Sequence, residues 1–259
     1  MSLPFLSSEH VEAFILIFLR VGAIIFTIPV ISDTSVPMRI KAAMTILISL
    51  IIFPLVLPKI PEPANYQVLI LMYRMAGEVM IGVIIGFSAR VVFAGIQMAG
   101  EMIGFQMGLS MANVIDPMTN QQVSTIAELQ YLMAMLVFLI VDAHHIFFSA
   151  IIQSYSIVSP LTFHFSGQLM QTIFEFSQEM FVIAVKLGAP LMAVMLFTNV
   201  GLGIIARTVP QMNIFIVGFP LQIGIGLIFL GLTAPLLVKM TQTLFAGLEF
   251  KIVSLLRLM

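Results

Sequence analysis

Seven long apolar runs constrain what this chain can fold into more than any other feature of its sequence. A helix needs about 20 predominantly apolar residues to cross the hydrocarbon core of a bilayer, and several runs approach or exceed that length. Hydrophobic residues make up 60% of the 259 residues and charged residues only 9%, against about 25% charged in a soluble domain. The pattern predicts an all-α, polytopic membrane protein of helical hairpins in one domain. The runs cover residues 11–31, 42–57, 68–99, 129–158, 169–205, 214–238 and 244–258.

Composition and motifs also argue against several classes of function. The chain has no cysteine, which excludes disulfides, thiolate metal sites and cysteine nucleophiles. Its 11 basic residues are scattered, so no basic patch suggests nucleic acid as a partner. The His-Glu-x-x-His and Gly-x-Ser-x-Gly motifs are absent. We therefore expect no catalytic residues, no cofactor and no enzyme activity. No basic residue precedes Arg20, so we expect the first run to be retained instead of cleaved as a signal peptide.

The apolar runs do not all predict simple membrane spans. Run 42–57 would rise about 24 Å as a helix, short of the roughly 30 Å hydrocarbon core, and Pro54 interrupts it. Six membrane-spanning helices would place the N-terminus and the C-terminus on the same side of the membrane, opposite the first loop. The positive-inside rule instead assigns both the C-terminus, with Lys251 and Arg257, and the first loop, with Arg39 and Lys41, to the cytoplasm. Some helices are therefore expected to be buried against protein instead of lipid.

The central part of the chain carries glycines at regular spacing. Gly100, Gly104 and Gly108 recur every four residues, which places them on one face of a helix where another backbone can approach closely. We expect this helix to end where Asp116-Pro117 forces the chain out of helical conformation. Two interpretations of these glycines stay open: ordinary packing between helices, or a tightly packed segment beside a channel. Five methionines accompany them, either as a deformable seal or as simple gap-fillers: Met98, Met102, Met107, Met111 and Met118.

Charged residues inside the apolar runs are costly and need partners. Arg74 and Glu78 can pair at i, i+4, and Glu175, Glu179 and Lys186 lie near one helical face. In one interpretation these charges form structural ion pairs. In the other they form a polar pathway or a contact with another subunit. The charges that we expect in one of these two roles are Arg74, Glu78, Arg90, Glu101 and Lys186.

Two further motifs contain residue types that suit metal binding or a turn between helices. Asp142, His144 and His145 offer a carboxylate and two imidazoles, but adjacent histidines point about 100° apart on a helix, so we expect no metal site. Near the C-terminus two long helices are predicted to form a hairpin with small residues along both arms. Its turn comprises Arg207, Pro210, Gln211 and Asn213.

At these residues the sequence resembles the FliR family of flagellar biosynthetic proteins and, more distantly, counterparts in virulence type III secretion. The central segment from Ala99-Gly100-Glu101 through Gln106-Met107-Gly108-Leu109-Ser110 to Asp116-Pro117 is similar to the family's central segment. Pro210-Gln211 followed by Ile214 to Leu221 is similar to its C-terminal signature, and Pro29, Pro37 and Arg39 agree with its N-terminal pattern. The resemblance covers essentially the whole chain.

The resemblance implies an architecture and a function that spacing alone does not show. It implies a non-enzymatic subunit of the flagellar export gate in the bacterial inner membrane, at the flagellar basal body. Partners would be FliP and FliQ, together with FlhA and FlhB, membrane lipid and the unfolded exported polypeptides. Residues 1–165 would be the FliP-like part and residues 166–259 a FliQ-like hairpin, within one export-gate domain, 1–259.

The resemblance also implies a pore plug within residues 104–122, mapped most closely to 106–122. Met111 stands where an aromatic residue is expected in such a plug, which implies a softer plug than in relatives. The residues assigned to the pore or plug are Gln106, Met107, Gly108, Leu109, Ser110, Met111, Val114, Ile115, Asp116 and Pro117.

Two other functions remain open at the level of sequence. A secondary transporter for a small solute is suggested by charges inside the apolar runs, namely Arg74, Glu78, Arg90 and Asp142. A transporter of this kind would act as a single polypeptide, whereas a gate subunit would be inert alone. An inert scaffold would differ from a gate only in whether residues 104–122 line the lumen.

Overall fold

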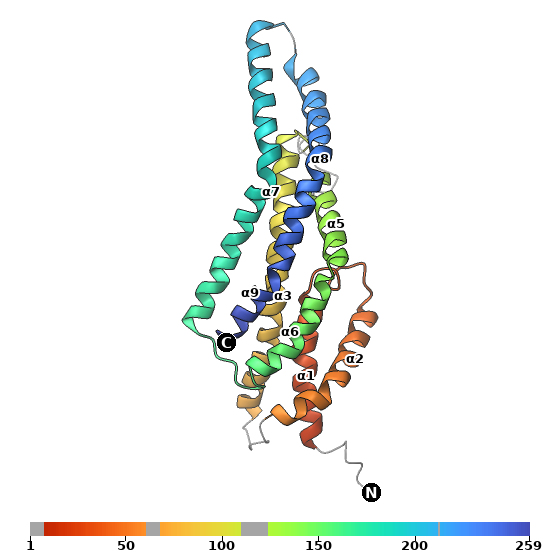
Figure 1. Ribbon diagram of the computed structural model, residues 1–259, viewed down its shortest axis with the longest axis vertical. Helices are drawn as coiled ribbons and strands as arrows, with labels where there is room; N and C mark the ends of the chain where they lie inside the picture. The colour runs from red at the N-terminus through yellow and green to blue at the C-terminus, as the bar shows by residue number, and fades with distance from the viewer. Residues whose placement is uncertain (1–7, 61–67, 110–123, 212) are drawn as a thin grey trace. The chain divides into compact units, whose positions relative to one another are not determined.

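The computed structural model describes residues 8–60, 68–109, 124–211 and 213–259. Within these ranges the chain consists of helices and their connections, with no strand (Figure 1). The prediction of an all-α chain is therefore confirmed. The elements are α1 (Ser8–Thr27), α2 (Met38–Val56), the short 3₁₀ helix η1 (Leu57–Lys59), α3 (Val68–Gln106), α5 (Thr125–Ile140), α6 (Ala143–Ile157), α7 (Gly167–Thr208), α8 (Ile214–Ala246) and α9 (Leu248–Leu256).

Each predicted apolar run corresponds to one helix or to a broken pair of helices. The run at 129–158 becomes α5 and α6, separated by Val141 and Asp142. The prediction that Pro54 interrupts the second run is wrong, because α2 continues through Pro54 to Val56. A proline so close to a helix end removes only one backbone hydrogen bond near the last turn. α7 and α8 also contain prolines, Pro190 in α7 and Pro220 and Pro235 in α8.

In the described residues, five helices are long and apolar enough to cross a membrane. The α5–α6 pair makes up to six if it counts as one span. α2 is among the five because it begins four residues before the apolar run and reaches 19 residues. The candidate spans are His10–Thr27, Met38–Val56, Leu71–Gln106, Gly167–Thr208 and Ile216–Leu256.

The chain forms two compact units, and three segments contribute to the first unit. Unit 1 comprises residues 1–91, 142–176 and 246–259, and unit 2 comprises residues 92–141 and 177–245. α3 and α7 each run through the boundary without a break in helical conformation. The predicted division at residue 165 concerns similarity to two other families and stays a prediction.

In unit 1, α1 packs closely on α3 at two glycines. A Cβ on Gly82 would lie 2.5 Å from the Ala23 Cβ, and a Cβ on Gly86 would overlap Thr27. Because the two glycines are four residues apart, both lie on the same face of α3 and the backbones approach closely. This Gly-x-x-x-Gly pair was not singled out in the sequence, although its spacing is a sufficient signal. α1 also packs along α2, and α6 contacts α9.

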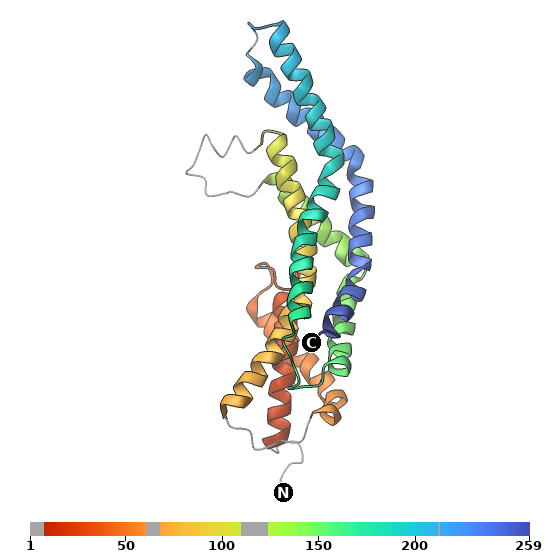
Figure 2. The same ribbon diagram turned by 90° about the vertical axis from the view of Figure 1, so that its left-hand side faces the viewer.

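In unit 2, the core contains two clusters of apolar side chains. The rings of Phe93, Phe138 and Phe245 lie 5.3–5.7 Å apart, centroid to centroid. The second cluster lies at the end of α3 and contains Ile103, Met107, Ile126, Leu191 and Met195. The final turns of α7 and the first turns of α8 run side by side as a hairpin (Figures 1 and 2). Gln222 of α8 donates a hydrogen bond to the Asn199 side chain of α7, at 2.6 Å.

Candidate functional site

The end of α3 packs tightly against the start of α5. A Cβ on Gly100 would lie 2.5 Å from the Cα of Ala127, and a Cβ on Gly104 would overlap the Ser124 side chain. Both positions therefore need glycine for the backbones to approach. Since α3 precedes residues 110–123 and α5 follows them, this contact holds the two ends of the central segment together.

Gly108 ends α3 through its backbone conformation. Its φ is +79°, a left-handed value that residues with a Cβ rarely adopt. Its amide donates to the carbonyl of Phe105 (3.1 Å), and the Leu109 amide donates to that of Gly104 (3.1 Å). This pair of bonds is the Schellman motif, which satisfies the last carbonyls of a helix. The predicted end of the helix at Asp116-Pro117 is therefore wrong: α3 ends at Gln106, because Gly108 reverses the chain first.

Met107 fills a closed space in unit 2. Its side chain is completely buried beside Leu191 and Met195 of α7. A Cβ on Gly226 of α8 would come within 2.7 Å of the Met107 side chain, so α8 fits around it only because residue 226 is glycine. The prediction that Met107 occludes a lumen stays a prediction; within the described residues its side chain packs in the core of unit 2.

The other predicted pore residues divide into two groups. Gln106 and Leu109 are half-buried, and Leu109 packs beside the second apolar cluster of unit 2. Outside the described residues lie Ser110, Met111, Val114, Ile115, Asp116 and Pro117.

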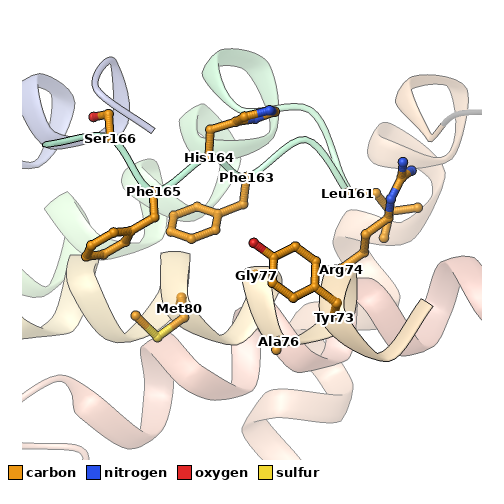
Figure 3. Close-up of a pocket in the computed structure, with 10 residues that line it drawn as sticks. All are labelled: Tyr73, Arg74, Ala76, Gly77, Met80, Leu161, Phe163, His164, Phe165 and Ser166. Atoms are coloured by element: carbon orange, nitrogen blue, oxygen red, sulfur yellow. The ribbon is translucent and has the colours of Figure 1, made fainter. Parts of the chain in front are cut away.

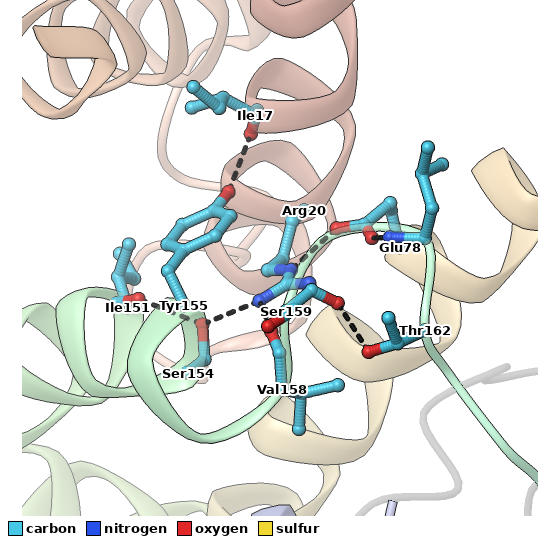
Figure 4. A network of polar contacts seen from close by, with 10 residues as sticks. Ile17, Arg20, Glu78, Ile151, Ser154, Tyr155, Val158, Ser159 and Thr162 are labelled. Atoms are coloured by element: carbon cyan, nitrogen blue, oxygen red, sulfur yellow. Dashed lines mark hydrogen bonds and ion pairs between the residues drawn. The ribbon is translucent and has the colours of Figure 1, made fainter. Parts of the chain in front are cut away.

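A buried ion pair joins α1 to α3 in unit 1 (Figure 4). The Arg20 Nε donates to the Glu78 Oε2 at 2.6 Å, and both side chains are completely buried. The other carboxylate oxygen of Glu78 accepts a bond from the Leu161 amide at 2.9 Å. Glu78, which the sequence suggested could pair with Arg74, is thus bonded through both oxygens to α1 and to the connection after α6. Arg20 was missed as a partner, although an arginine inside an apolar run is a signal in itself.

The same arginine ties α6 into unit 1. Its Nη1 donates to the Ser154 hydroxyl (3.3 Å) and to the Val158 carbonyl (3.1 Å). The ring of Tyr155 stacks on the guanidinium, 4.1 Å from its carbon to the ring centroid, which adds a cation–π attraction. The Tyr155 hydroxyl donates to the Ile17 carbonyl at 3.3 Å. Three helices therefore meet at one buried charge.

The other charged residues that were expected to have a structural or subunit-contact role lie at other positions in the fold. Arg90 is exposed and donates to the carbonyls of Thr27 (2.8 Å) and Phe26 (3.3 Å), where a cation stabilises the C-terminal end of α1. Glu101 and Lys186 are exposed. Lys186 and Glu179 line a groove of about 220 Å³ between α7 and α8. Of the five predicted charges, only Glu78 belongs to the buried network.

Arg74 lines a pocket of about 600 Å³ in unit 1 (Figure 3). The loop between α6 and α7 covers the first turns of α3 there, because Gly77 leaves room for Phe163. His164 lines the same pocket, and its amide donates to the carbonyl of the last residue, Met259, at 3.0 Å. Most of the remaining lining is apolar or aromatic, including Tyr73, Met80 and Phe165.

The α7–α8 hairpin has its turn at the predicted residues. α7 ends at Thr208 and α8 begins at Ile214. Arg207, Pro210, Gln211 and Asn213 are exposed, and the Asn213 carbonyl accepts from the Ile216 amide at 3.1 Å. At four glycines of the two arms, an added Cβ would have no neighbour within 4 Å in the described chain apart from the nearby backbone of its own helix: Gly201, Gly203, Gly224 and Gly231.

The α5–α6 break brings the residues Asp142, His144 and His145 together. One potential ligand atom from each lies within 4.8 Å of the other two. The expectation that the two histidines diverge is wrong for their rings, whose centroids are 4.2 Å apart. Both histidines lie on the first turn of α6. Because no earlier turn of that helix restricts their side chains, the rings can tilt toward one another.

These features define an all-α membrane protein built around buried charges and close helix contacts. The chain belongs to the family of bacterial export proteins, family 1, whose model matches residues 11–248. The resemblance seen in the sequence is thereby confirmed.

Curated relatives agree with this family. The flagellar biosynthetic protein FliR of Bacillus subtilis is 35% identical over 225 residues, covering 84% of each chain. FliR of Escherichia coli is 29% identical over 231 residues, covering 88% of this chain and 86% of its own. FliR of Caulobacter vibrioides is 31% identical over 235 residues, with 88% and 91% covered. The chain is thus a member of an export family whose named relatives are flagellar biosynthetic proteins, and these names describe no catalytic activity.

Proposed function

We propose that this chain is a non-enzymatic core subunit of the flagellar type III export gate, through which unfolded flagellar proteins leave the cell. The observation that carries the proposal is the family match over residues 11–248, nearly the whole chain. In this proposal the subunit acts with FliP and FliQ, and with FlhA and FlhB, in the inner membrane at the flagellar basal body. Residues 1–165 are its FliP-like part and residues 166–259 its FliQ-like hairpin.

The contacts at the end of α3 support a plug formed by the central segment. The Schellman turn at Gly108 ends the helix, and the Gly100 and Gly104 contacts hold α5 beside it. We propose that Met107, buried in the core, anchors the segment, and that residues from Leu109 onward occlude the lumen.

The uncovered apolar surface of α8 supports a place in an assembly. In the most apolar 18-residue window of the candidate span Ile216–Leu256, which α8 and α9 share, only 11% is buried within this chain. Lipid can cover such a surface, and so can neighbouring helical subunits. The open glycine positions of the hairpin favour neighbouring helices, because small residues let helices approach closely.

A small-solute transporter is the alternative that rested on intramembrane charges. The contacts of two of these charges, Glu78 and Arg90, favour the gate instead. Glu78 is bonded to Arg20 and to the Leu161 amide, and Arg90 is bonded to carbonyls of α1. A transported ion or solute needs charges that exchange partners, whereas these contacts hold helices together.

Deleting residues 110–118 tests the plug. We expect the assembled complex with the deletion to leak small ions, because the occluding residues are gone while Gly100, Gly104 and Gly108 still hold α3. The measurement is ion flux across vesicles that contain the purified complex. A complex that assembles normally and remains as impermeable as the intact one would show that the segment is not the plug.

A photo-crosslinking residue at position 109 separates the gate from an inert scaffold. A stalled export substrate should crosslink at Leu109 but not at Met107, whose buried side chain provides the matched control. Equal crosslinking at both positions, or none at either, would contradict a lumen lined by this segment.

A further inference from the structure

The three residues at the α5–α6 break form a cluster of metal-ligand types outside the proposed gate. His144 Nε2 and His145 Nδ1 each lie 4.0 Å from the same carboxylate oxygen, Asp142 Oδ1. All three potential ligand atoms lie within 4.8 Å of one another. Two imidazole nitrogens and one carboxylate oxygen are the donor set of many zinc sites with an open position.

The backbone around the break explains why the three side chains meet. Asp142 has a φ of +54° and precedes the first residue of α6. An aspartate at this position commonly caps the helix with its side chain, but the Asp142 carboxylate makes no such bond. Within the described chain it is directed to the two histidines instead, so its oxygens remain available as ligands.

The separations fit a divalent ion after a small adjustment. Tetrahedral zinc with ligands at about 2.0–2.2 Å requires ligand atoms about 3.4 Å apart. The observed 4.0 Å separations to Asp142 close by about 0.6 Å, and the third separation, which is within 4.8 Å, closes by at most about 1.4 Å, through rotations of the side chains. The side chains of Asp142 and His145 are 68% and 69% exposed and that of His144 is 30% exposed, so Asp142 and His145 supply most of the movement.

We propose that Asp142, His144 and His145 bind one borderline divalent transition-metal ion, of which Zn²⁺ is the best match. Water completes the coordination. Ca²⁺ and Mg²⁺ fit poorly because they prefer several oxygen ligands, and the cluster supplies a single carboxylate. The site is modest in affinity because the helix N-terminus carries partial positive charge. The ion holds the Asp142 side chain against the first turn of α6.

The test uses the full chain, purified in detergent without a histidine tag. Zn²⁺ binding is measured by titration calorimetry, and Co²⁺ is used as a spectroscopic probe whose visible absorption reports nitrogen and oxygen ligands. We expect one Zn²⁺ per chain. His145→Asn and Asp142→Asn should each weaken binding at least about tenfold. Asparagine also tolerates the left-handed backbone at position 142, so Asp142→Asn changes the ligand while keeping the fold.

His164→Asn is the matched control. His164 is exposed and lies outside the cluster, with its Nδ1 against the Thr162 carbonyl, so binding should be unchanged. Melting temperatures without metal should match among all the variants. The proposal is overturned if wild-type protein binds no Zn²⁺, or if His145→Asn and His164→Asn have the same effect. It is independent of the export function, because binding is read without transport.

Discussion

At the scale of single residues, Arg20 and Glu78 form a buried contact of unit 1 that is sensitive to the loss of either partner. Both are completely buried, and a buried charge is tolerated only when it is paired and hydrogen-bonded. Removing one partner leaves the other charged and desolvated, whereas removing both leaves only apolar packing to be adjusted. Loss of either residue therefore weakens the contact among all three helices, α1, α3 and α6.

Arg20→Met should destabilise the protein by about 3–5 kcal/mol, because it leaves the Glu78 carboxylate buried without its cation. The double variant Arg20→Met, Glu78→Leu should recover most of this loss. Thermal unfolding of the purified protein in detergent measures both. Glu101→Gln, at an exposed position, serves as the control and should change little. Equal destabilisation by the single and double variants would contradict the assigned pairing.

At the scale of elements, the length and order of the helices follow from the apolar runs, because hydrophobic periods over 15 or more residues are strong signals. What the runs do not reveal are the ends set by local backbone chemistry. Gly108 ends α3 although apolar residues continue beyond it, and Pro54 does not end α2. The partner of Glu78 also escapes prediction, since Arg20 is 58 residues away in the chain and their proximity depends on how α1 packs on α3.

Gly100→Val should destabilise the α3–α5 contact by about 1–3 kcal/mol, the usual range for overpacking a close contact. The added side chain meets the backbone of Ala127, which cannot move aside as a flexible side chain can. Gly201→Val adds the same atoms to a helix position with nothing within 4 Å, and should be nearly neutral in the isolated chain. Chemical unfolding followed by circular dichroism compares the two. Equal effects would show that Gly100 is not a contact glycine.

At the scale of the whole molecule, the sequence predicts a membrane protein and its family. It does not predict which helix surfaces are buried within the chain and which face lipid or other subunits. Composition alone identifies a membrane protein, because 9% charged residues cannot solvate a soluble fold. Burial differs greatly among the candidate spans, from 67% of the 18-residue window in Leu71–Gln106 to 11% of that in Ile216–Leu256. These two spans are similarly apolar, so hydrophobicity by itself does not distinguish core helices from those that face lipid or other subunits.

Leu232→Asp tests the surface of α8. Leu232 is 69% exposed, and an acidic residue in the middle of a span costs about 2.5–3.5 kcal/mol when it faces lipid. We expect the variant to accumulate poorly in the membrane fraction and to be missing from the assembled complex. Leu232→Ala, which keeps an apolar surface, should accumulate normally. Normal accumulation of the aspartate variant would mean that this face of α8 contacts water.

The buried Arg20–Glu78 pair also has a consequence for the order of events during synthesis. Arg20 leaves the ribosome 58 residues before Glu78, which at about 5–20 residues per second is an interval of roughly 3–12 seconds. During that interval the first apolar segment carries an arginine without its carboxylate, a state that opposes stable residence in lipid. We therefore expect the integration of α1 to be complete only after the first turns of α3 have been made, and the N-terminal segment to depend on the insertion machinery until then.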